Sequence, residues 1–366
     1  MNIFVFGSSI LSSYWNGAAT YYRGIYKYLA RRGHHITFAE PDAYNRQQHR
    51  DNGDFSYVES IIYKPHTDID QMLAVAADAD IVIKHSGVGV DDTLLESRVP
   101  ELDRHSVVIF WDVDAPATIG RLKSNPGDPF RQHIPRYDAI LTYGGGPLSR
   151  DEYLHFGACR YQSIYNGLDP DTHYPVACDP NLQCDVMFLG NRMPDREQRV
   201  EELFLKAATF APNKTFILGG EGWQDKPLPP NVRWIGHVST DNHNRLNCSA
   251  GMIMNINRTS MATFGFSPPT RVFEVAGAGG CLLCDDWPGI EECFNIGDEL
   301  LVVRSAQDVV DALDRYDSAE RQRMGQALHN RALRDHTYAQ RAASAERVFE
   351  ECLDARASSP MPAGAA

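Results

Sequence analysis

The sequence has no hydrophobic run long enough to cross a membrane. Residues 2–6 form an apolar segment, but no basic region precedes them, and no stretch approaches the ~18 consecutive apolar residues of a membrane-spanning helix. We therefore expect a protein without a secretory leader or a membrane span. The loose, Pro- and Ala-rich segment 357–366 is expected to be a tail.

A surplus of basic residues is also missing. The chain has 48 acidic and 35 basic side chains, a formal net charge of −13, and neither half is basic. Proteins that follow nucleic-acid phosphates, or that attach strongly to anionic membranes, carry an excess of Lys and Arg. The charge therefore argues against both kinds of partner.

Cysteine is absent from the first 158 residues, and all eight cysteines follow them. Only Cys281 and Cys284 have the spacing of a metal-binding or redox pair. No second pair accompanies them, and they lie in an apolar run that predicts a buried strand. We interpret them as structural residues. Reduced thiols are expected, which favours a cytoplasmic location.

The chain is long enough for about two domains, and its composition, 43% hydrophobic and 23% charged, is that of a globular protein. Short apolar runs such as 2–6, 81–84 and 106–111 alternate with amphipathic segments and end in Gly, Pro or Asp clusters. Such runs are typical of parallel strands covered on both faces. A second series of the same kind begins near Cys184.

The alternation predicts an α/β protein with two Rossmann-like domains that face each other across a cleft. We place an N-terminal domain at 1–170, a C-terminal domain at 171–340, and a closing helix with a disordered tail at 341–366. Ligands of such sheets bind beyond the carboxyl ends of the strands. A nicotinamide-dependent dehydrogenase is disfavoured, because Gly7 and the residues after it do not spell G-x-G-x-x-G.

Several motifs lie in the order found in one known architecture. They are Trp15-Asn16-Gly17, Arg-Gly-His-His-Ile-Thr at 32–37, Asn-Gly-Leu-Asp at 166–169, Gly-Gly-Glu-Gly at 219–222, and the run from Pro269 to Gly280. In these the chain resembles the two-Rossmann (GT-B) glycosyltransferases. Segments 269–280, 291–294 and 336–338 resemble the CgeB (spore maturation protein) branch of the group 1 transferases.

The sequence departs from the glycogen-synthase-like retaining family, whose two glutamates are separated by seven residues. If Glu274 is the second, Phe266 stands where the first would be. The resemblance implies a transferase that moves a sugar from a nucleotide-sugar donor, with a UDP-sugar favoured, to a small molecule, glycan or protein. It implies no further cofactor and no divalent metal. A sugar-nucleotide epimerase and a non-catalytic sugar-nucleotide-binding module remain open as alternatives.

The donor is expected at the helix that begins near Thr270. A helix N-terminus offers unpaired N–H groups and partial positive charge to a diphosphate, and Arg271 can add a bidentate contact. Arg192, after the strand that ends near Gly190, is a second candidate for phosphate binding. Glu274, one turn into the helix, is expected to accept the ribose hydroxyls.

The base of the nucleotide is expected near Gly236 and His237, where similar folds use backbone groups. The acceptor is expected at the loop formed by Trp15, Asn16 and Gly17, after the first strand. Aromatic side chains there can stack on a sugar, although such residues also serve as core packing.

A transferase that inverts its anomeric centre needs a base beside the acceptor hydroxyl. Asp114 is the first candidate and Asp112 or His85 the second, because all three follow predicted strands. Each could instead cap a helix, shape a turn or be a buried structural group. Asp112 and Asp114 also spell the Asp-x-Asp that binds a divalent metal in single-sheet glycosyltransferases. Here the helix and the arginines are expected to neutralise the phosphates instead.

Overall fold

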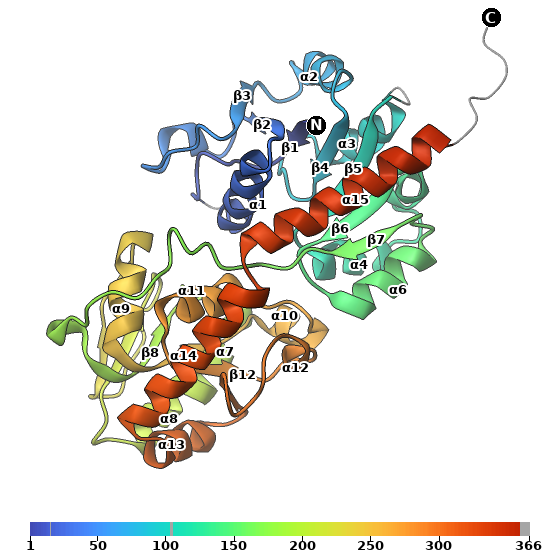
Figure 1. Cartoon of the computed structure of the whole chain (residues 1–366). Helices are drawn as coiled ribbons and strands as arrows, with labels where there is room; N and C mark the ends of the chain where they lie inside the picture. The colour runs from blue at the N-terminus through green and yellow to red at the C-terminus, as the bar shows by residue number, and fades with distance from the viewer. Residues whose placement is uncertain (15, 103–104, 359–366) are drawn as a thin grey trace, which may run out of the picture. The chain divides into compact units, whose positions relative to one another are not determined.

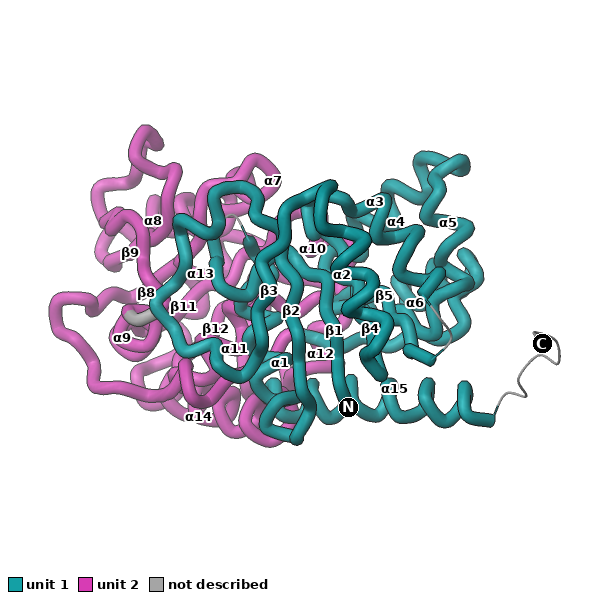
Figure 2. Tube along the Cα trace, turned by 90° about the horizontal axis from the view of Figure 1, so that it is seen from above, with its two compact units in different colours: residues 1–165, 338–366 teal, residues 166–337 magenta. Residues whose placement is uncertain are grey.

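The computed structural model describes residues 1–14, 16–102 and 105–358, with the side chain of Asp241 excepted. It divides into two compact units, unit 1 with residues 1–165 and 338–366, and unit 2 with residues 166–337 (Figure 2). The domain boundaries expected from the sequence, at 170/171 and 340/341, remain predictions.

Unit 1 is built on a seven-stranded sheet with strand order β3-β2-β1-β4-β5-β6-β7, in which every pairing is parallel (Figure 1). Its strands are β1 (Asn2–Phe6), β2 (His35–Pro41), β3 (Glu59–Tyr63), β4 (Ile81–His85), β5 (Val107–Asp112), β6 (Ala139–Thr142) and β7 (Tyr161–Ser163). Its helices are α1 (Ala19–Arg31), α2 (Ile69–Ala76), α3 (Asp92–Arg98), α4 (Ala115–Ser124), α5 (Phe130–His133), α6 (Gly146–His155) and α15 (Tyr338–Ser358).

The last helix of the chain, α15, packs against α1 and the sheet of unit 1. A Cβ at Gly24 in α1 would lie 2.4 Å from the ring of Tyr338, so glycine allows the two helices to approach closely. Unit 1 is therefore formed by both ends of the described chain. No helix in residues 1–14, 16–102 and 105–358 is both long and apolar enough to span a bilayer.

Unit 2 has a six-stranded parallel sheet with strand order β10-β9-β8-β11-β12-β13. Its strands are β8 (Cys184–Leu189), β9 (Phe216–Gly219), β10 (Val232–Trp234), β11 (Ala250–Asn255), β12 (Leu282–Asp285) and β13 (Leu301–Val303). Its helices are α7 (Pro194–Val200), α8 (Lys206–Phe210), α9 (His243–Ser249), α10 (Thr259–Phe264), α11 (Thr270–Ala278), α12 (Ile290–Cys293), α13 (Ala306–Arg315) and α14 (Ser318–Asp335).

The predicted α/β class with two Rossmann-like domains is confirmed. Both sheets start from a central strand, build outwards to one side and then continue on the other, which is the doubly wound order. The strands missed in the sequence, β3, β7 and β13, all lie at a sheet edge. The helical segment after β8 contains a π-helical turn at Glu201–Leu205, between α7 and α8.

Cys281 and Cys284 are both buried in the hydrophobic core of unit 2, with free thiols. Cys281 Sγ lies 3.9 Å from Met324 Sδ, and the indole of Trp287 donates to Cys284 Sγ at 3.4 Å. These surroundings are those of core packing, in agreement with the structural interpretation.

Candidate functional site

In unit 2 the strand order reverses between β8 and β11, the two central strands of the sheet. The segment after β8 leads into α7, and the segment after β11 leads through α10 into α11. The carboxyl ends of the strands beside such a reversal are where open α/β sheets bind their ligands. The segments that follow β8 and β11, both of which carry arginines, and the start of α11 therefore lie at this edge of the sheet.

Glu274 lies in the second turn of α11 and is only 13% exposed. Its Oε2 is 2.8 Å from Arg271 Nη1 and 3.4 Å from His243 Nδ1. Burial alone would raise the pKa of Glu274, but the charge of Arg271, followed by His243 and His173, holds it well below its usual range. Glu274 is thus an ionised hydrogen-bond acceptor that is largely shielded from solvent.

Two further arginines, which the sequence analysis did not single out, lie at the same edge. Burial lowers the pKa of Arg196, and the positive charges of Arg258 and Arg271 lower it further, whereas Asp195 and Asp285 raise it. The three guanidinium groups are therefore close enough to interact. The buried Nε of Arg196 has no hydrogen-bond partner in the described part of the chain.

Arg258 follows β11, and its Nε donates to Asp195 Oδ2 at 2.7 Å. The side chain of Arg196 lies over the end of β8, because a Cβ on Gly190 would come within 2.7 Å of Arg196 Nη1. A usable signal was present in the sequence, because both arginines closely follow strands of the predicted second sheet. Arg258 is paired with Asp195 and Arg271 with Glu274, so the three arginines together bring more guanidinium groups to these strand ends than those two carboxylates occupy. Positive charge gathered in this way favours an anion as the ligand.

Arg192 is already engaged. Its guanidinium pairs with Glu197 at 2.7 Å and with Asp225 at 2.9 Å, and it donates to the carbonyl of Gly222 at 3.3 Å. The hydrogen bond to Glu197 is the main reason that its pKa is raised. A contact between Arg192 and a phosphate would require it to leave these partners.

The other predicted donor residues lie on two segments. Thr270 is the first residue of α11, and no side chain caps that N-terminus. Gly236 has a positive φ of 72°, and its carbonyl accepts a hydrogen bond from the amide of Gly220 at 2.7 Å. His237 beside it is exposed. The Gly236 carbonyl thus fixes the loop after β9, and open space surrounds the position of a Cβ at Gly236.

In unit 1, Asp112 and Asp114 occupy different environments although only one residue separates them. Asp112, the last residue of β5, is fully buried. Asp114 is exposed and is the N-cap residue of α4, but its side chain makes no capping hydrogen bond. Asp112 Oδ1 accepts the backbone N–H of Asp114 at 3.0 Å. The buried carboxylate therefore holds the backbone that presents the exposed one.

Three hydroxyl groups complete the surroundings of Asp112. Ser86 Oγ donates to its Oδ1 at 2.6 Å, Thr118 Oγ1 donates to the same oxygen at 3.1 Å, and Tyr153 donates to Oδ2 at 2.5 Å. Ser86 Oγ also accepts the N–H of Val113 at 2.8 Å. This arrangement is that of a satisfied buried carboxylate.

His85 is buried as well. Its Nε2 is 2.5 Å from the hydroxyl of Tyr26, and its ring packs on Tyr22 and Trp111 with centroid distances of 4.4 and 5.4 Å. Burial lowers the pKa of His85 to about 3. Of the three predicted catalytic side chains, only Asp114 is solvent-exposed.

The predicted acceptor loop is described in part. Trp15 lies outside the described residues. Asn16 is buried, and its amide donates to the carbonyls of Ser9 and Ser12 at 2.7 and 3.1 Å and accepts from Ser8 at 2.9 Å. Asn16 thereby closes the loop after β1. Gly17 is exposed, with open space around the position of a Cβ.

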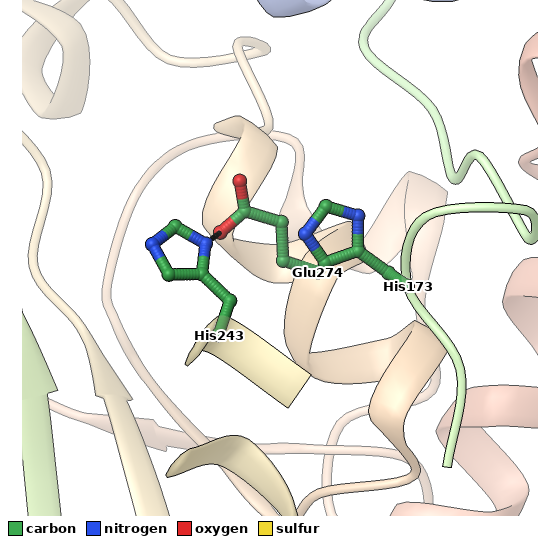
Figure 3. A group of neighbouring side chains, drawn as sticks. All are labelled: His173, His243 and Glu274. Carbon is green, nitrogen blue, oxygen red and sulfur yellow. Dashed lines mark ion pairs between the residues drawn. The ribbon is translucent and has the colours of Figure 1, made fainter. Parts of the chain in front are cut away.

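One group of metal-ligand side chains was not foreseen. His173, His243 and Glu274 bring one ligand atom each within 4.8 Å of one another (Figure 3). Figure 3 shows the two imidazole rings on either side of the Glu274 carboxylate. Because 70 residues of sequence separate the two histidines, only the folded unit brings them together.

Residues 196–347 match the family model described as glycosyl transferase-like. No curated protein matches the chain in sequence. Solved structures match nearly its whole length at low identity, and they show that the fold is that of the GT-B glycosyltransferases.

Three of these structures are representative. Sucrose-phosphate synthase from Thermosynechococcus elongatus is 12% identical, with a TM-score of 0.69 over 97% of this chain and 100% of that one. HepE from Anabaena in complex with UDP-glucose is 13% identical, with a TM-score of 0.65 over 96% and 100%. An alpha-glucosyltransferase in complex with UDP and a 13-mer DNA is 12% identical, with a TM-score of 0.68 over 96% and 99%.

Proposed function

We propose that the protein is a glycosyltransferase whose unit 2 binds a nucleoside diphosphate sugar. The observation that carries the proposal is the ionised, nearly buried Glu274 on α11, one turn from the helix N-terminus and beside a group of arginines. A nucleoside diphosphate sugar presents two ribose hydroxyls and two phosphates. These are the groups that a carboxylate acceptor and clustered positive charge would recognise.

In this proposal the N–H groups at Thr270 and Arg271 and the guanidiniums of Arg271, Arg196 and Arg258 hold the diphosphate. Glu274 accepts the ribose hydroxyls. Gly236 and His237 border the base, and Arg192 keeps its predicted phosphate role only if it leaves its carboxylate partners. The helix and arginines provide the positive charge that a divalent metal provides in other transferases.

A UDP-sugar is the favoured donor, since similar structures were solved with UDP-glucose and with UDP. The proposed acceptor is a small molecule, a glycan or a protein. Two of the similar structures contain DNA. The net charge of −13 still favours an acceptor without a phosphate backbone. Assignment to the CgeB branch and a cytoplasmic location remain predictions.

Asp114 is the proposed base. The acceptor oxygen attacks the anomeric carbon, the bond from that carbon to the phosphate oxygen breaks, and the nucleoside diphosphate leaves with the electron pair. Asp114 takes the acceptor proton. Its exposure at the end of β5 allows contact with an acceptor, whereas Asp112 and His85 are enclosed by their partners. We assign Asp112 the role of positioning the backbone of Asp114.

The test is to incubate the full chain with UDP-, GDP- and dTDP-sugars and candidate acceptors, and to quantify nucleoside diphosphate and sugar products. Acceptor-dependent release of one nucleoside diphosphate, lost in Asp114→Asn, is expected. Conversion of the donor sugar without release would instead identify an epimerase. Donor binding without turnover of any acceptor would identify a binding module.

A further inference from the structure

Three buried side-chain atoms in unit 2 lie close together. They are His173 Nε2, His243 Nδ1 and Glu274 Oε2, and each lacks a hydrogen-bond partner in the described part of the chain. Buried polar atoms are nearly always satisfied, because an unpaired one has given up its hydrogen bonds to water without gaining others. Glu274 Oε2 is partly satisfied, because Arg271 Nη1 lies 2.8 Å and His243 Nδ1 3.4 Å from it. His173 Nε2, buried beside this carboxylate, has no partner in the described part of the chain and therefore indicates a missing binding partner.

The hydrogen bonds around His173 show which of its nitrogens is the acceptor. The Thr172 hydroxyl donates its proton to the carbonyl of Asp169 at 3.1 Å, so at 2.9 Å it accepts from Nδ1–H of His173. With the proton on Nδ1, the lone pair of the neutral ring lies on Nε2. A histidine held in this way by its other nitrogen is typical of metal ligands.

One of the three ligand distances is the distance expected around a small dication. Tetrahedral zinc with bonds of about 2.0–2.1 Å places its ligand atoms about 3.3–3.4 Å apart. The separation of His243 Nδ1 and Glu274 Oε2 is 3.4 Å, and all three ligand atoms lie within 4.8 Å of one another. Figure 3 shows the two rings on either side of the Glu274 side chain, with the carboxylate turned towards His243.

Arg271 does not block such a site. A carboxylate oxygen has two lone pairs, so Oε2 can bind a metal and still receive Arg271, which lies 2.8 Å away. Two imidazoles and one carboxylate form a donor set that favours zinc and its neighbours over magnesium, which prefers oxygen ligands.

We propose that His173, His243 and Glu274 form a binding site for a zinc-class dication, and that the metal competes with the nucleotide donor for Glu274. The inference of a metal site rests on the three side chains alone. The competition also rests on the proposed function, because there Glu274 is the ribose acceptor. The ion at this site is an inhibitor of donor binding and takes no part in sugar transfer.

The test uses the full chain after treatment with EDTA and removal of the chelator. Cobalt(II) is titrated as a spectroscopic probe and zinc(II) by calorimetry. We expect one ion per chain, bound at least tenfold more weakly by each of His173→Gln, His243→Gln and Glu274→Gln. Equal binding by wild type and His173→Gln, or no binding by wild type, would overturn the proposal.

His35→Gln is the matched control. His35 Nε2 and Glu59 Oε2 are also 3.4 Å apart, but both side chains are more than 60% exposed. This variant should bind the metal like the wild type. If a ligand variant fails to fold, anomalous scattering from zinc-soaked wild-type crystals decides, since the peak must lie among the three side chains and a peak elsewhere refutes the site.

Competition is measured separately as UDP affinity with EDTA and with saturating zinc(II). The EDTA value tests the proposed function by itself. Zinc is expected to weaken UDP binding at least tenfold in wild type. If zinc binds at the three residues and UDP affinity does not change, the metal site stands and the shared use of Glu274 is refuted.

Discussion

Replacing Glu274 by Gln should weaken UDP binding about 30-fold. A hydrogen bond to an ionised carboxylate contributes about 1.5–3 kcal/mol. Gln keeps one acceptor oxygen in place and loses the charge, so the expected loss is that of about one such bond. A loss of about 2 kcal/mol corresponds to ~30-fold in Kd. Calorimetry with UDP in the presence of EDTA measures the effect.

Two comparisons separate the ribose contact from a general disturbance. Glu291→Gln, on the exposed surface of α12, should bind UDP like wild type. 2′-Deoxy-UDP should bind wild type more weakly than UDP, but this difference should shrink in Glu274→Gln, because the two changes remove the same contact. A folded Glu274→Gln protein that binds UDP within twofold of wild type would refute the assignment.

Four further predictions concern unit 1. Asp114→Asn should lower kcat at least ~100-fold with unchanged UDP affinity, and a kcat within tenfold of wild type would exclude this base. Asp112→Ala should destabilise unit 1 by about 2–4 kcal/mol in urea, because three buried hydroxyls lose their acceptor; a change below ~0.5 kcal/mol would contradict the network. Gly24→Ala should cost about 1–3 kcal/mol of stability by overpacking α1 on α15, whereas Gly120→Ala, with open space around it, should not. Burial lowers the pKa of His85 to about 3, so below pH ~6.5 the unfolded chain binds a proton that the folded chain does not, and the free energy of unfolding falls as the pH falls. Between pH 7 and 5 the His85→Gln variant should therefore lose about 2 kcal/mol less stability than the wild type. Equal dependence of the unfolding free energy on pH in the two proteins would refute this.

The sequence predicted the central strands well and the edges poorly. Strands such as β4 and β5 are buried along their whole length, so they appear as continuous apolar runs. The edge strand β3 is mostly half-exposed, and β7 and β13 have three residues each. A short, partly polar strand has no periodicity that separates it from a loop.

The candidate site was predictable to the extent that it is local in sequence. Helix α11 begins at Thr270, as predicted, directly after Pro269. The sequence did not show which of Asp112 and Asp114 is buried, since both follow the same strand. That difference depends on Ser86, Thr118 and Tyr153, whose proximity only the fold creates.

The same reason explains the missed arginines and histidines. Arg196 and Arg258 are 62 residues apart in sequence and meet because β8 and β11 are neighbours. His173 and His243 come from different segments around α11. Long-range groups of this kind leave no local pattern.

The most direct measurement of the central claim is the melting temperature of the full chain with millimolar UDP, GDP or dTDP, all in EDTA. A ligand that binds only the folded state raises Tm by mass action. We predict that one nucleoside diphosphate, UDP by preference, raises Tm in wild type and has little effect on a folded Arg271→Ala variant. The absence of a shift with all three nucleotides would contradict the account of unit 2 as a nucleotide-sugar-binding domain.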